Sequence, residues 1–437
     1  MVDFGRSDDP RVQAQLDRLS QLSVPQGRFG LETIAALMER LGNPHRKLPP
    51  VFHVAGTNGK GSTCAFLRAM LEADGKRVHV TTSPHLVRYN ERFRVAGELI
   101  SDAALADLLQ EVLDASEQGG EDLGPSFFEV TIAAAFLAFS REPADACVVE
   151  VGLGGRLDAT NVLEPEALAA CGIAALGLDH EAFLLRPEDG TPDEPMARIA
   201  FEKAGIAKRG VPLAILEYAY PPEAQSAILA VAKREGADLQ DQFLNFFISS
   251  GEPYYQTDYY DETLLLPALT GEHQAFNLGL AITMLLSQDK IAIGDEAIKQ
   301  GARTARWPAR MQRLEEGPLT VLTSNRPVWL DGGHNPSAGK AIAEAIDSPV
   351  HLIIGMLANK NPNALTGPFA GRIASLSIVP VPGHDSHPAQ AFGDQAVARA
   401  DLEDALLNLA NDELPVLIAG SLYLAGEALR LNDEVPD

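Results

Sequence analysis

A short glycine-rich segment near residue 56 constrains the fold of this chain more than any other feature. The apolar run 51–54 predicts a buried strand, and apolar residues at helical spacing over 62–73 predict a helix. The turn between them, GTNGKG over 56–61, directs backbone N–H groups toward an anion, and the helix N-terminus adds positive potential. The spacing departs from the usual GxxxxGKS/T loop because Gly61 stands between Lys60 and Ser62.

The strand–turn–helix context favours a phosphate site over an ordinary glycine-rich turn. The glycines permit close backbone approach, Lys60 can reach terminal phosphates, and the Ser62 hydroxyl can bind phosphate or metal. The candidate phosphate-binding residues are Gly56, Thr57, Asn58, Gly59, Lys60, Gly61 and Ser62.

Strands and helices alternate along the rest of the chain, which predicts an α/β fold with mostly parallel sheets. In the first part, strands are expected at 51–54, 78–82, 146–151, 171–176 and 212–216, and helices at 10–22, 31–41, 62–73, 102–116, 127–140, 195–207, 222–236, 275–286 and 295–305. The aromatic-rich residues 238–267 predict a small antiparallel β excursion, and 186–195 a polar surface insertion.

A break at Trp307-Pro308 predicts a domain boundary, since 437 residues suit two domains at about 100–200 residues each. We expect an N-terminal P-loop-type domain with a mostly parallel sheet over 1–306 and a smaller Rossmann-like α/β domain over 307–437. In the second, strands are expected at 328–331, 350–354, 374–379 and 416–419, and helices at 338–345, 395–409 and 422–431.

Composition excludes several classes of protein. The chain has 35 Lys+Arg and 60 Asp+Glu, a formal charge of −25, which disfavours nucleic acid and anionic membranes as partners. Three scattered cysteines without a CxxC pair argue against disulfides and structural zinc. No signal peptide or run of about 18 apolar residues is present, so we expect a cytoplasmic protein.

Polar residues follow several predicted strands, where the ligand edge of an open α/β sheet lies. Ser83 follows one strand, Glu150 ends another, and His180 follows a third. A carboxylate beside a phosphate loop suits magnesium, although Glu150 could instead pair with Arg156. A lone His such as His180 is more often structural. For Lys203, the residue pattern alone favours a solvated charged face.

Four later residues add candidate nucleotide contacts. Asn277 opens a helix and could bond an adenine edge or merely cap the helix, and Arg310 lies at the domain junction. Asp331 and His334 end the first clear strand of the second domain, again at a ligand edge.

Together these segments resemble the folylpolyglutamate synthase family, including bacterial bifunctional dihydrofolate synthases, within the Mur ligase superfamily. The similarity rests on HVAGTNGKGS, TSPHL, NERFRV, FFE, EVGLGGRLDATN, LDH, EKAGI, HQxxN and DGGHNP, in the family's order, from about residue 30 to Glu427. Mur ligases share the phosphate loop and the DxxHNP element, so the folate-type segments decide between the two.

The resemblance implies the residue roles. ATP would contact the loop 56–62 with Asn277, Arg310, Asp331 and His334. Two Mg²⁺ ions would be held by Ser83, Glu150, His180 and a carbon dioxide-derived carbamate on Lys203, which reverses the solvated-face interpretation. Lys60, His180 and Lys203 would be catalytic. The pterin pocket would be shaped by Ser126, Phe127, Phe128, Glu129, Leu157, Asp158 and Ala159.

The implied activity is ATP-dependent addition of L-glutamate to dihydropteroate, to reduced folates, or to both, through an acyl phosphate and with ADP and phosphate as products. A monomer is the default that the resemblance implies. Two alternatives remain open: a Mur-type ligase with a UDP-linked muramyl acceptor, and a nucleotide-binding relative without ligase activity.

Overall fold

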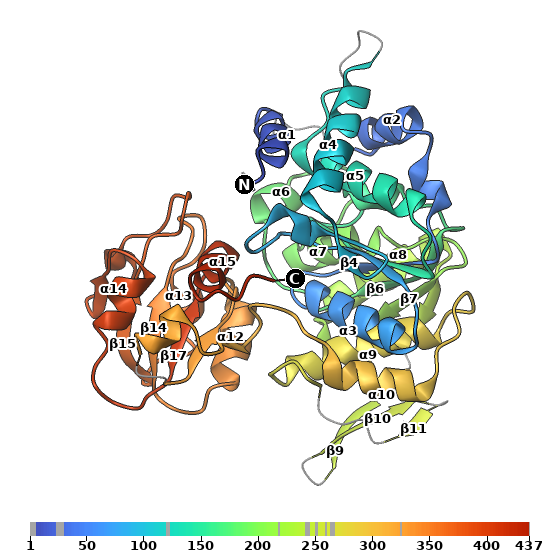
Figure 1. Ribbon diagram of the computed structural model, residues 1–437. Helices are drawn as coiled ribbons and strands as arrows, with labels where there is room; N and C mark the ends of the chain where they lie inside the picture. The colour runs from blue at the N-terminus through green and yellow to red at the C-terminus, as the bar shows by residue number, and fades with distance from the viewer. Residues whose placement is uncertain are drawn as a thin grey trace. The chain divides into compact units, whose positions relative to one another are not determined.

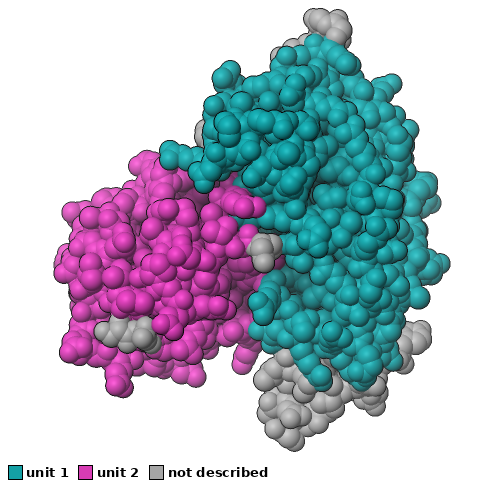
Figure 2. Space-filling model, viewed as in Figure 1, with its two compact units in different colours: residues 1–84, 89–268, 275–306 teal, residues 85–88, 269–274, 307–437 magenta. Residues whose placement is uncertain are grey.

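The computed structural model describes most of the chain, with gaps at the termini and in several loops. It covers residues 6–22, 30–118, 123–216, 219–240, 245–249, 252–257, 260–262, 267–323 and 326–436. The chain divides into two compact units (Figure 2). Unit 1 comprises Met1–Pro84, Tyr89–Ala268 and Ala275–Arg306, and unit 2 comprises His85–Arg88, Leu269–Gln274 and Trp307–Asp437. Two short segments, His85–Arg88 and Leu269–Gln274, come from the range expected for the first domain but are grouped with unit 2.

An eight-stranded sheet forms the centre of unit 1, in the order β4-β3-β2-β5-β1-β6-β7-β8. Its strands are β1 (Val51–Ala55), β2 (Val78–Thr81), β3 (Phe93–Val95), β4 (Glu98–Leu99), β5 (Ala146–Glu150), β6 (Leu168–Ile173), β7 (Pro212–Ile215) and β8 (Asp238–Gln240). Only β3 and β4 pair antiparallel. Every residue of β1 and β5 is buried, because helices cover both faces of a parallel sheet.

The helices of unit 1 lie on both faces of this sheet (Figure 1). Helix α3 packs with α10 on one face, and α5, α7 and α8 lie on the other. The helices are α1 (Pro10–Ser20), α2 (Glu32–Arg40), α3 (Lys60–Ala73), α4 (Asp102–Ser116), α5 (Phe127–Arg141), α6 (Glu181–Leu184), α7 (Pro195–Ala204), α8 (Pro222–Glu235), α9 (His273–Leu286) and α10 (Asp295–Thr304). The doubly wound arrangement places the loops after β1, β5 and β6 at one edge of the sheet.

The expected β excursion is confirmed in part. Strands β9 (Asn245–Ser249), β10 (Glu252–Thr257) and β11 (Tyr260–Glu262) form a three-stranded antiparallel sheet. Strand β8, which lies within the same predicted range, instead extends the main sheet by pairing parallel to β7.

Unit 2 contains a six-stranded sheet in the order β12-β13-β17-β14-β15-β16, parallel except for β12. Its strands are β12 (Gln312–Arg313), β13 (Val328–Leu330), β14 (Val350–Ile354), β15 (Ile373–Ile378), β16 (Ala396–Ala398) and β17 (Val416–Ala419). Its helices are α11 (Pro318–Val321), α12 (Pro336–Glu344), α13 (Asn363–Thr366), α14 (Leu402–Leu407) and α15 (Leu422–Leu431). The expected α/β class with mostly parallel sheets is confirmed in both units.

The helix predicted over 395–409 is wrong. Ala396–Ala398 instead pair parallel with β15 as the edge strand β16, and only α14 is helical. Asp401 caps α14 by accepting the N–H of Asp404 at 2.8 Å, which fixes the helix start at Leu402, seven residues later than expected. The helical pattern of this segment is weak, and pairing with β15 gives its backbone hydrogen-bond partners. Such a partner strand cannot be recognised from the local sequence pattern.

Among the described residues, no helix is both long enough and apolar enough to cross a membrane. The three cysteines are free and buried.

Candidate active site

The phosphate loop lies between β1 and α3, as the sequence predicts. The N–H groups of Thr57 and Asn58 donate to the carbonyl of Ala175 at 2.8 and 3.1 Å, and the Thr57 hydroxyl donates to the carbonyl of Gly177 at 3.0 Å. These bonds tie the loop to the segment that follows β6. The first N–H groups of α3 have no acceptor within the helix, so they remain directed at the ligand edge.

Gly59 caps α3 in a left-handed conformation, with φ of 83°. A Cβ atom at this position would lie 2.2 Å from Oδ1 of Asn277, which is buried at the start of α9. Asn277 therefore lies directly against the phosphate loop, where its amide can contact a bound nucleotide.

Glu150, at the end of β5, lies beside the loop with its side chain only 6% exposed. Its Oε2 accepts the N–H of Ser83 at 3.1 Å, and its Oε1 lies 4.0 Å from Nζ of Lys60. The alternative pairing with Arg156 is wrong, because that guanidinium bonds Glu188 and Glu202. The Glu150 carboxylate and the Ser83 hydroxyl are hard oxygen donors of the kind that Mg²⁺ prefers, so this pair fits a divalent cation beside the phosphate loop.

Lys203 is buried rather than on a solvated face, so the interpretation from the residue pattern is wrong. Its exposed fraction is 4%, and Nζ donates to the carbonyl of Gly56 at 2.9 Å. Burial, reinforced by the nearby charge of Lys60, lowers the pKa of Lys203 to about 7. A large share of these amines is therefore neutral at neutral pH, which gives a nucleophilic nitrogen beside the phosphate loop.

His180 adopts a left-handed backbone, with φ of 54°, at the start of α6. The carboxylate of Asp179 accepts the His180 N–H at 2.8 Å and also acts electrostatically on Lys203. The segment after β6 thus lies near Lys203. Among the described residues, no group of three or more His, Cys, Asp or Glu side chains is arranged to hold a metal.

The segments expected to shape a pterin pocket lie side by side in unit 1. Ser126 and Glu129 form a capping box at the start of α5, with bonds of 3.2 and 2.7 Å. The Phe128 ring lies over Gly152, where a Cβ atom would come within 2.4 Å of the ring. Glycine at position 152 is therefore what lets this aromatic ring reach the loop that contains Leu157 to Ala159.

The carboxylate of Asp158 organises that loop by binding backbone N–H groups of the loop. Its carboxylate accepts the N–H of Leu153 at 2.8 Å and the N–H of Thr160 at 3.0 Å. Burial raises the pKa of Asp158, against the hydrogen bonds from Thr160 and Leu153 that stabilise the ionised form. Asp158 therefore fixes the shape of the loop.

One buried contact at this site was not predicted from the sequence. His53, in the middle of β1, bonds the hydroxyl of Thr160 at 2.8 Å, and that hydroxyl donates to Asp158 at 2.5 Å. Because the Thr160 hydrogen goes to Asp158, Nε2 of His53 must be the donor. The signal that could have revealed this contact is a histidine in an otherwise apolar buried strand.

In unit 2, the carboxylate of Asp331 joins two turns. It accepts the N–H of Met311 at 2.8 Å and the N–H of Gly333 at 2.7 Å. Arg310 lies between two residues with left-handed backbones, Ala309 and Met311, and its guanidinium donates to the Ala309 carbonyl at 2.9 Å. Nδ1 of His334 donates to the Gly332 carbonyl at 3.1 Å. The three predicted residues of unit 2 thus share one strand-end cluster.

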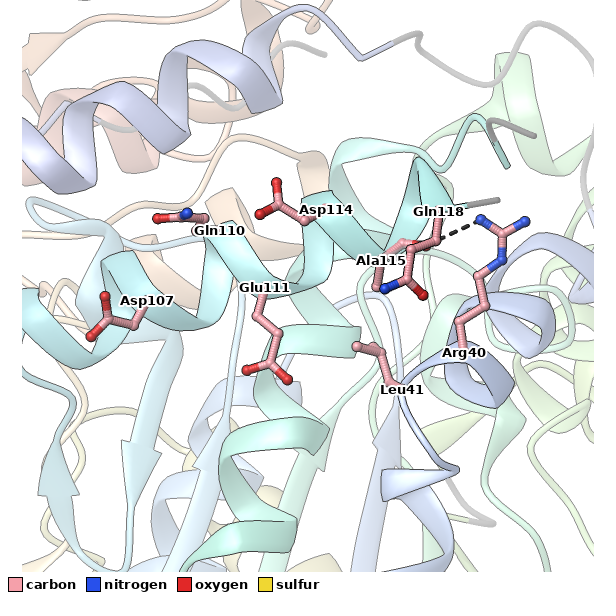
Figure 3. A pocket seen from close by; sticks show the side chains of 8 residues that line it. All are labelled: Arg40, Leu41, Asp107, Gln110, Glu111, Asp114, Ala115 and Gln118. Atoms are coloured by element: carbon pink, nitrogen blue, oxygen red, sulfur yellow. Dashed lines mark hydrogen bonds between the residues drawn. The ribbon is translucent and has the colours of Figure 1, made fainter. Parts of the chain in front are cut away.

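A hollow of about 500 Å³ in unit 1 lies away from all of these residues (Figure 3). It runs along α4 and is lined by Arg40, Leu41, Asp107, Gln110, Glu111, Asp114, Ala115 and Gln118. The Arg40 guanidinium closes one end by donating to the carbonyls of Ala115 and Ser116 at 3.1 and 2.9 Å. None of the predicted site residues lines this hollow.

The fold and site of unit 1 define a class: a phosphate-loop nucleotide-binding α/β protein equipped for phosphoryl transfer. No protein-family model matches the chain. Bacillus subtilis dihydrofolate synthase/folylpolyglutamate synthase is 34% identical to it over 438 residues, covering 91% of this chain and 94% of the relative. At this identity along nearly the whole length, the chain belongs to the folylpolyglutamate synthase/dihydrofolate synthase family.

Solved structures agree with this membership. The E. coli FolC structure in complex with DHPP and ADP has a TM-score of 0.82 at 28% identity and covers 98% of each chain. A bifunctional folylpolyglutamate synthase/dihydrofolate synthase with Mn, AMPPNP and L-glutamate bound has a TM-score of 0.79 at 29% identity, covering 98% of this chain and 99% of that chain.

Gly59→Ala should weaken ADP binding roughly tenfold or more, because a left-handed alanine costs about 1–2 kcal/mol and its methyl group would displace Asn277. Titration calorimetry with ADP and Mg²⁺ measures the effect. Gly75→Ala is the matched control, since Gly75 has a similar φ of 75° and no atom within 4 Å of the added carbon. Equal affinities for the two variants would contradict the packing of Asn277 on the loop.

The stability of unit 1 should fall as pH drops from about 6.5 to about 3. Burial lowers the pKa of His53 to about 3, so the unfolded chain binds a proton in this window that the folded chain does not. The loss is about 5 kcal/mol across the window. Urea unfolding followed by circular dichroism at several pH values, with His53→Gln for comparison, measures it. If the free energy of unfolding of His53→Gln changes with pH as steeply as that of the wild type, His53 is not the group responsible.

Proposed function

We propose that this chain joins the amine of L-glutamate to a carboxylate of dihydropteroate, of reduced folates, or of both, converting ATP to ADP and phosphate. The observation that carries the proposal is its full-length similarity to synthases of this name. The site chemistry agrees with it, since Lys60, Glu150 and Ser83 adjoin a phosphate loop.

A carboxylate does not react with an amine directly, because its negative charge and resonance make the carbon a poor electrophile. Transfer of the terminal phosphoryl group of ATP to a carboxylate oxygen forms an acyl phosphate and releases ADP. The amine of glutamate then attacks the acyl carbon, the C–O bond to phosphate breaks, and the nitrogen loses a proton. The products are the amide and phosphate.

The residues of unit 1 supply the positioning that this route needs. The N–H groups at the start of α3 and the Lys60 ammonium bind the phosphates and offset charge on the transferred group. Glu150 and Ser83 would hold a divalent cation, which when bound supplies further positive charge to the phosphoryl oxygens. The nucleotide analogue with Mn in a related structure supports this assignment.

For a second Mg²⁺, we assign His180 and a carbamate on Lys203. The neutral amine attacks the carbon of carbon dioxide, a C–N bond forms as one C–O π bond opens onto oxygen, and the nitrogen loses a proton, so a neutral amine becomes an anionic carbamate. Burial of Lys203 beside Gly56 supports this, because the neutral form that reacts is favoured there. Lys60, His180 and Lys203 are accordingly the proposed catalytic residues.

Further roles follow from the same similarity. Asn277, Arg310, Asp331 and His334 would contact ATP. Ser126 to Glu129 and Leu157 to Ala159 would line the pterin pocket, with Asp158 holding the loop in shape. A cytoplasmic location remains a prediction from the sequence. A Mur-type acceptor is not favoured, since the relatives reported above are named for folates.

Incubation with ATP, Mg²⁺ and L-glutamate should release ADP in the presence of dihydropteroate, of tetrahydrofolate, or of both. A coupled ADP assay measures the rate, and mass spectrometry of the product detects one added glutamate. Phosphate rather than pyrophosphate is the expected co-product, because the route passes through an acyl phosphate.

ADP release with neither pterin would refute the proposed function. Tight ADP binding without product formation would favour a nucleotide-binding relative that lacks ligase activity. Turnover that requires a UDP-linked muramyl acceptor would identify a Mur-type ligase.

Lys203→Ala should abolish glutamate ligation, and formate or acetate should restore part of it by occupying the place of the carbamate. Wild-type protein in carbon-13 bicarbonate should show a carbamate signal in the NMR spectrum, and Lys203→Ala should lose it. Lys233→Ala is the matched control, because Lys233 lies exposed on the neighbouring helix α8. Wild-type activity in Lys203→Ala would refute the carbamate role.

A further inference from the structure

Four charged side chains of alternating sign form one connected cluster beside Lys203 on helix α7. Arg156 bonds Glu188 at 2.5 Å and Glu202 at 3.0 Å, and Arg198 bonds the same two carboxylates at 2.9 and 3.0 Å. We call these four residues the ion-pair frame. The side chains of Arg198 and Glu202 are each only 6% exposed, so the inner half of the frame is shielded from water.

The frame stands over one aromatic ring. The guanidinium carbons of Arg156 and Arg198 lie 5.4 and 5.9 Å from the centre of the Phe201 ring. The planar guanidinium groups thus gain a cation–π contact in addition to two carboxylate partners each. This geometry restricts both arginines to one orientation.

Three segments that contain proposed metal ligands meet at the frame. Arg156 follows Glu150 by six residues, and Glu202 directly precedes Lys203. Arg198 donates through Nε to the carbonyl of Leu184, four residues after His180, at 3.1 Å. The frame therefore links the loops after β5 and β6 to helix α7.

Backbone contacts also join the loop that contains Arg156 to helix α7. The N–H of Arg156 donates to the carbonyl of Glu202 at 2.7 Å, and a Cβ atom on Gly205 would lie 2.4 Å from Cβ of Arg156. Because the loop that contains Arg156 is in direct contact with the end of α7, a shift of Arg156 or Arg198 would displace the backbone next to Lys203.

Glu188 balances the charge of this arrangement. It comes from the polar insertion after His180, and the Arg156 guanidinium beside it holds the pKa of its carboxyl below the usual range. Without Glu188, two guanidinium groups would share the single carboxylate of Glu202, and a surplus positive charge would stand near the proposed cation site. Removing one partner of a buried ion pair is destabilising, because the charge that stays behind is uncompensated.

We infer that Glu188 is a positioning residue for glutamate ligation: it completes the ion-pair frame and so holds Lys203 and the His180 segment in place for Mg²⁺. The inference rests on the proposed function for its catalytic part. The polar insertion thus has a role at the site, although most of its residues are exposed.

Glu188→Gln removes the charge at nearly constant size, and Asp189→Asn is the matched control at the exposed neighbouring residue. We expect Glu188→Gln to lower kcat roughly 10- to 100-fold and to raise the Mg²⁺ concentration for half-maximal rate, with KM for the pterin substrate unchanged. Asp189→Asn should match the wild type in all three quantities. If Glu188→Gln does not fold, Glu188→Asp keeps the charge but shortens the reach, and the same shifts are expected.

Hydrogen exchange of backbone amides measures how firmly Glu188 holds helix α7, and it does not depend on catalytic turnover. Amides of α7 should exchange faster in Glu188→Gln than in the wild type or Asp189→Asn, while amides of α3 stay unchanged. Equal exchange in α7, or a lower kcat with unchanged Mg²⁺ dependence, would overturn the inference. Wild-type protein that turns over no pterin would refute the proposed function instead, and the exchange result would still decide the structural part.

Discussion

Burial of charge at one edge of the unit 1 sheet is the constraint on which the rest of the site depends. Glu150, Glu202 and Lys203 are each at most 5% exposed. A buried ionisable group is tolerated only where partners offset the lost hydration or where it gives up part of its charge, as Lys203 does, so each of these groups depends on the positions of others. Glu150 holds the Ser83 backbone, Lys203 holds the Gly56 carbonyl, and Glu202 holds two arginines. The phosphate loop and helix α7 are consequently locked together.

The same constraint explains how a chain with a formal charge of −25 can handle anionic substrates. ATP, a pterin carboxylate and glutamate are all repelled by the overall field, which solvent ions screen beyond about 10 Å. Local cations at a few ångströms are screened much less when they are partly buried, as Lys60 is, with 16% of its side chain exposed. A carbamate on Lys203 would add negative charge at the edge where a metal is required, so both the acidic composition and the site favour strong dependence on Mg²⁺.

Much of this arrangement could be predicted from the sequence, because the signals are local. The strand–turn–helix around Lys60 and the strand-end position of Glu150 follow from hydrophobic runs and glycines that act over a few residues. The burial of Lys203 could not be predicted from its own helix, since Glu202 and Lys203 form a pattern equally typical of a solvated face. Segments distant in the sequence cover them: Arg156 donates its N–H to the Glu202 carbonyl, and the Gly56 carbonyl accepts from Lys203. The edge strand β16 was missed for the same reason, as its partner β15 lies about 20 residues earlier.

Residues that shape the loops and residues proposed to bind substrate differ in what their substitution would affect. Asp158 and Asp331 satisfy their carboxylates with backbone N–H groups of neighbouring turns, so their substitution acts first on loop shape. Lys60 places Nζ 4.0 Å from the Glu150 carboxylate and 3.5 Å from the Thr57 carbonyl, and Ser83 meets Glu150 through its backbone N–H, so neither contact is a short side-chain bond. The carboxylates of Asp158 and Asp331 thus hold the loops, while Lys60 and Ser83 are the groups that we propose to meet the phosphates and the metal.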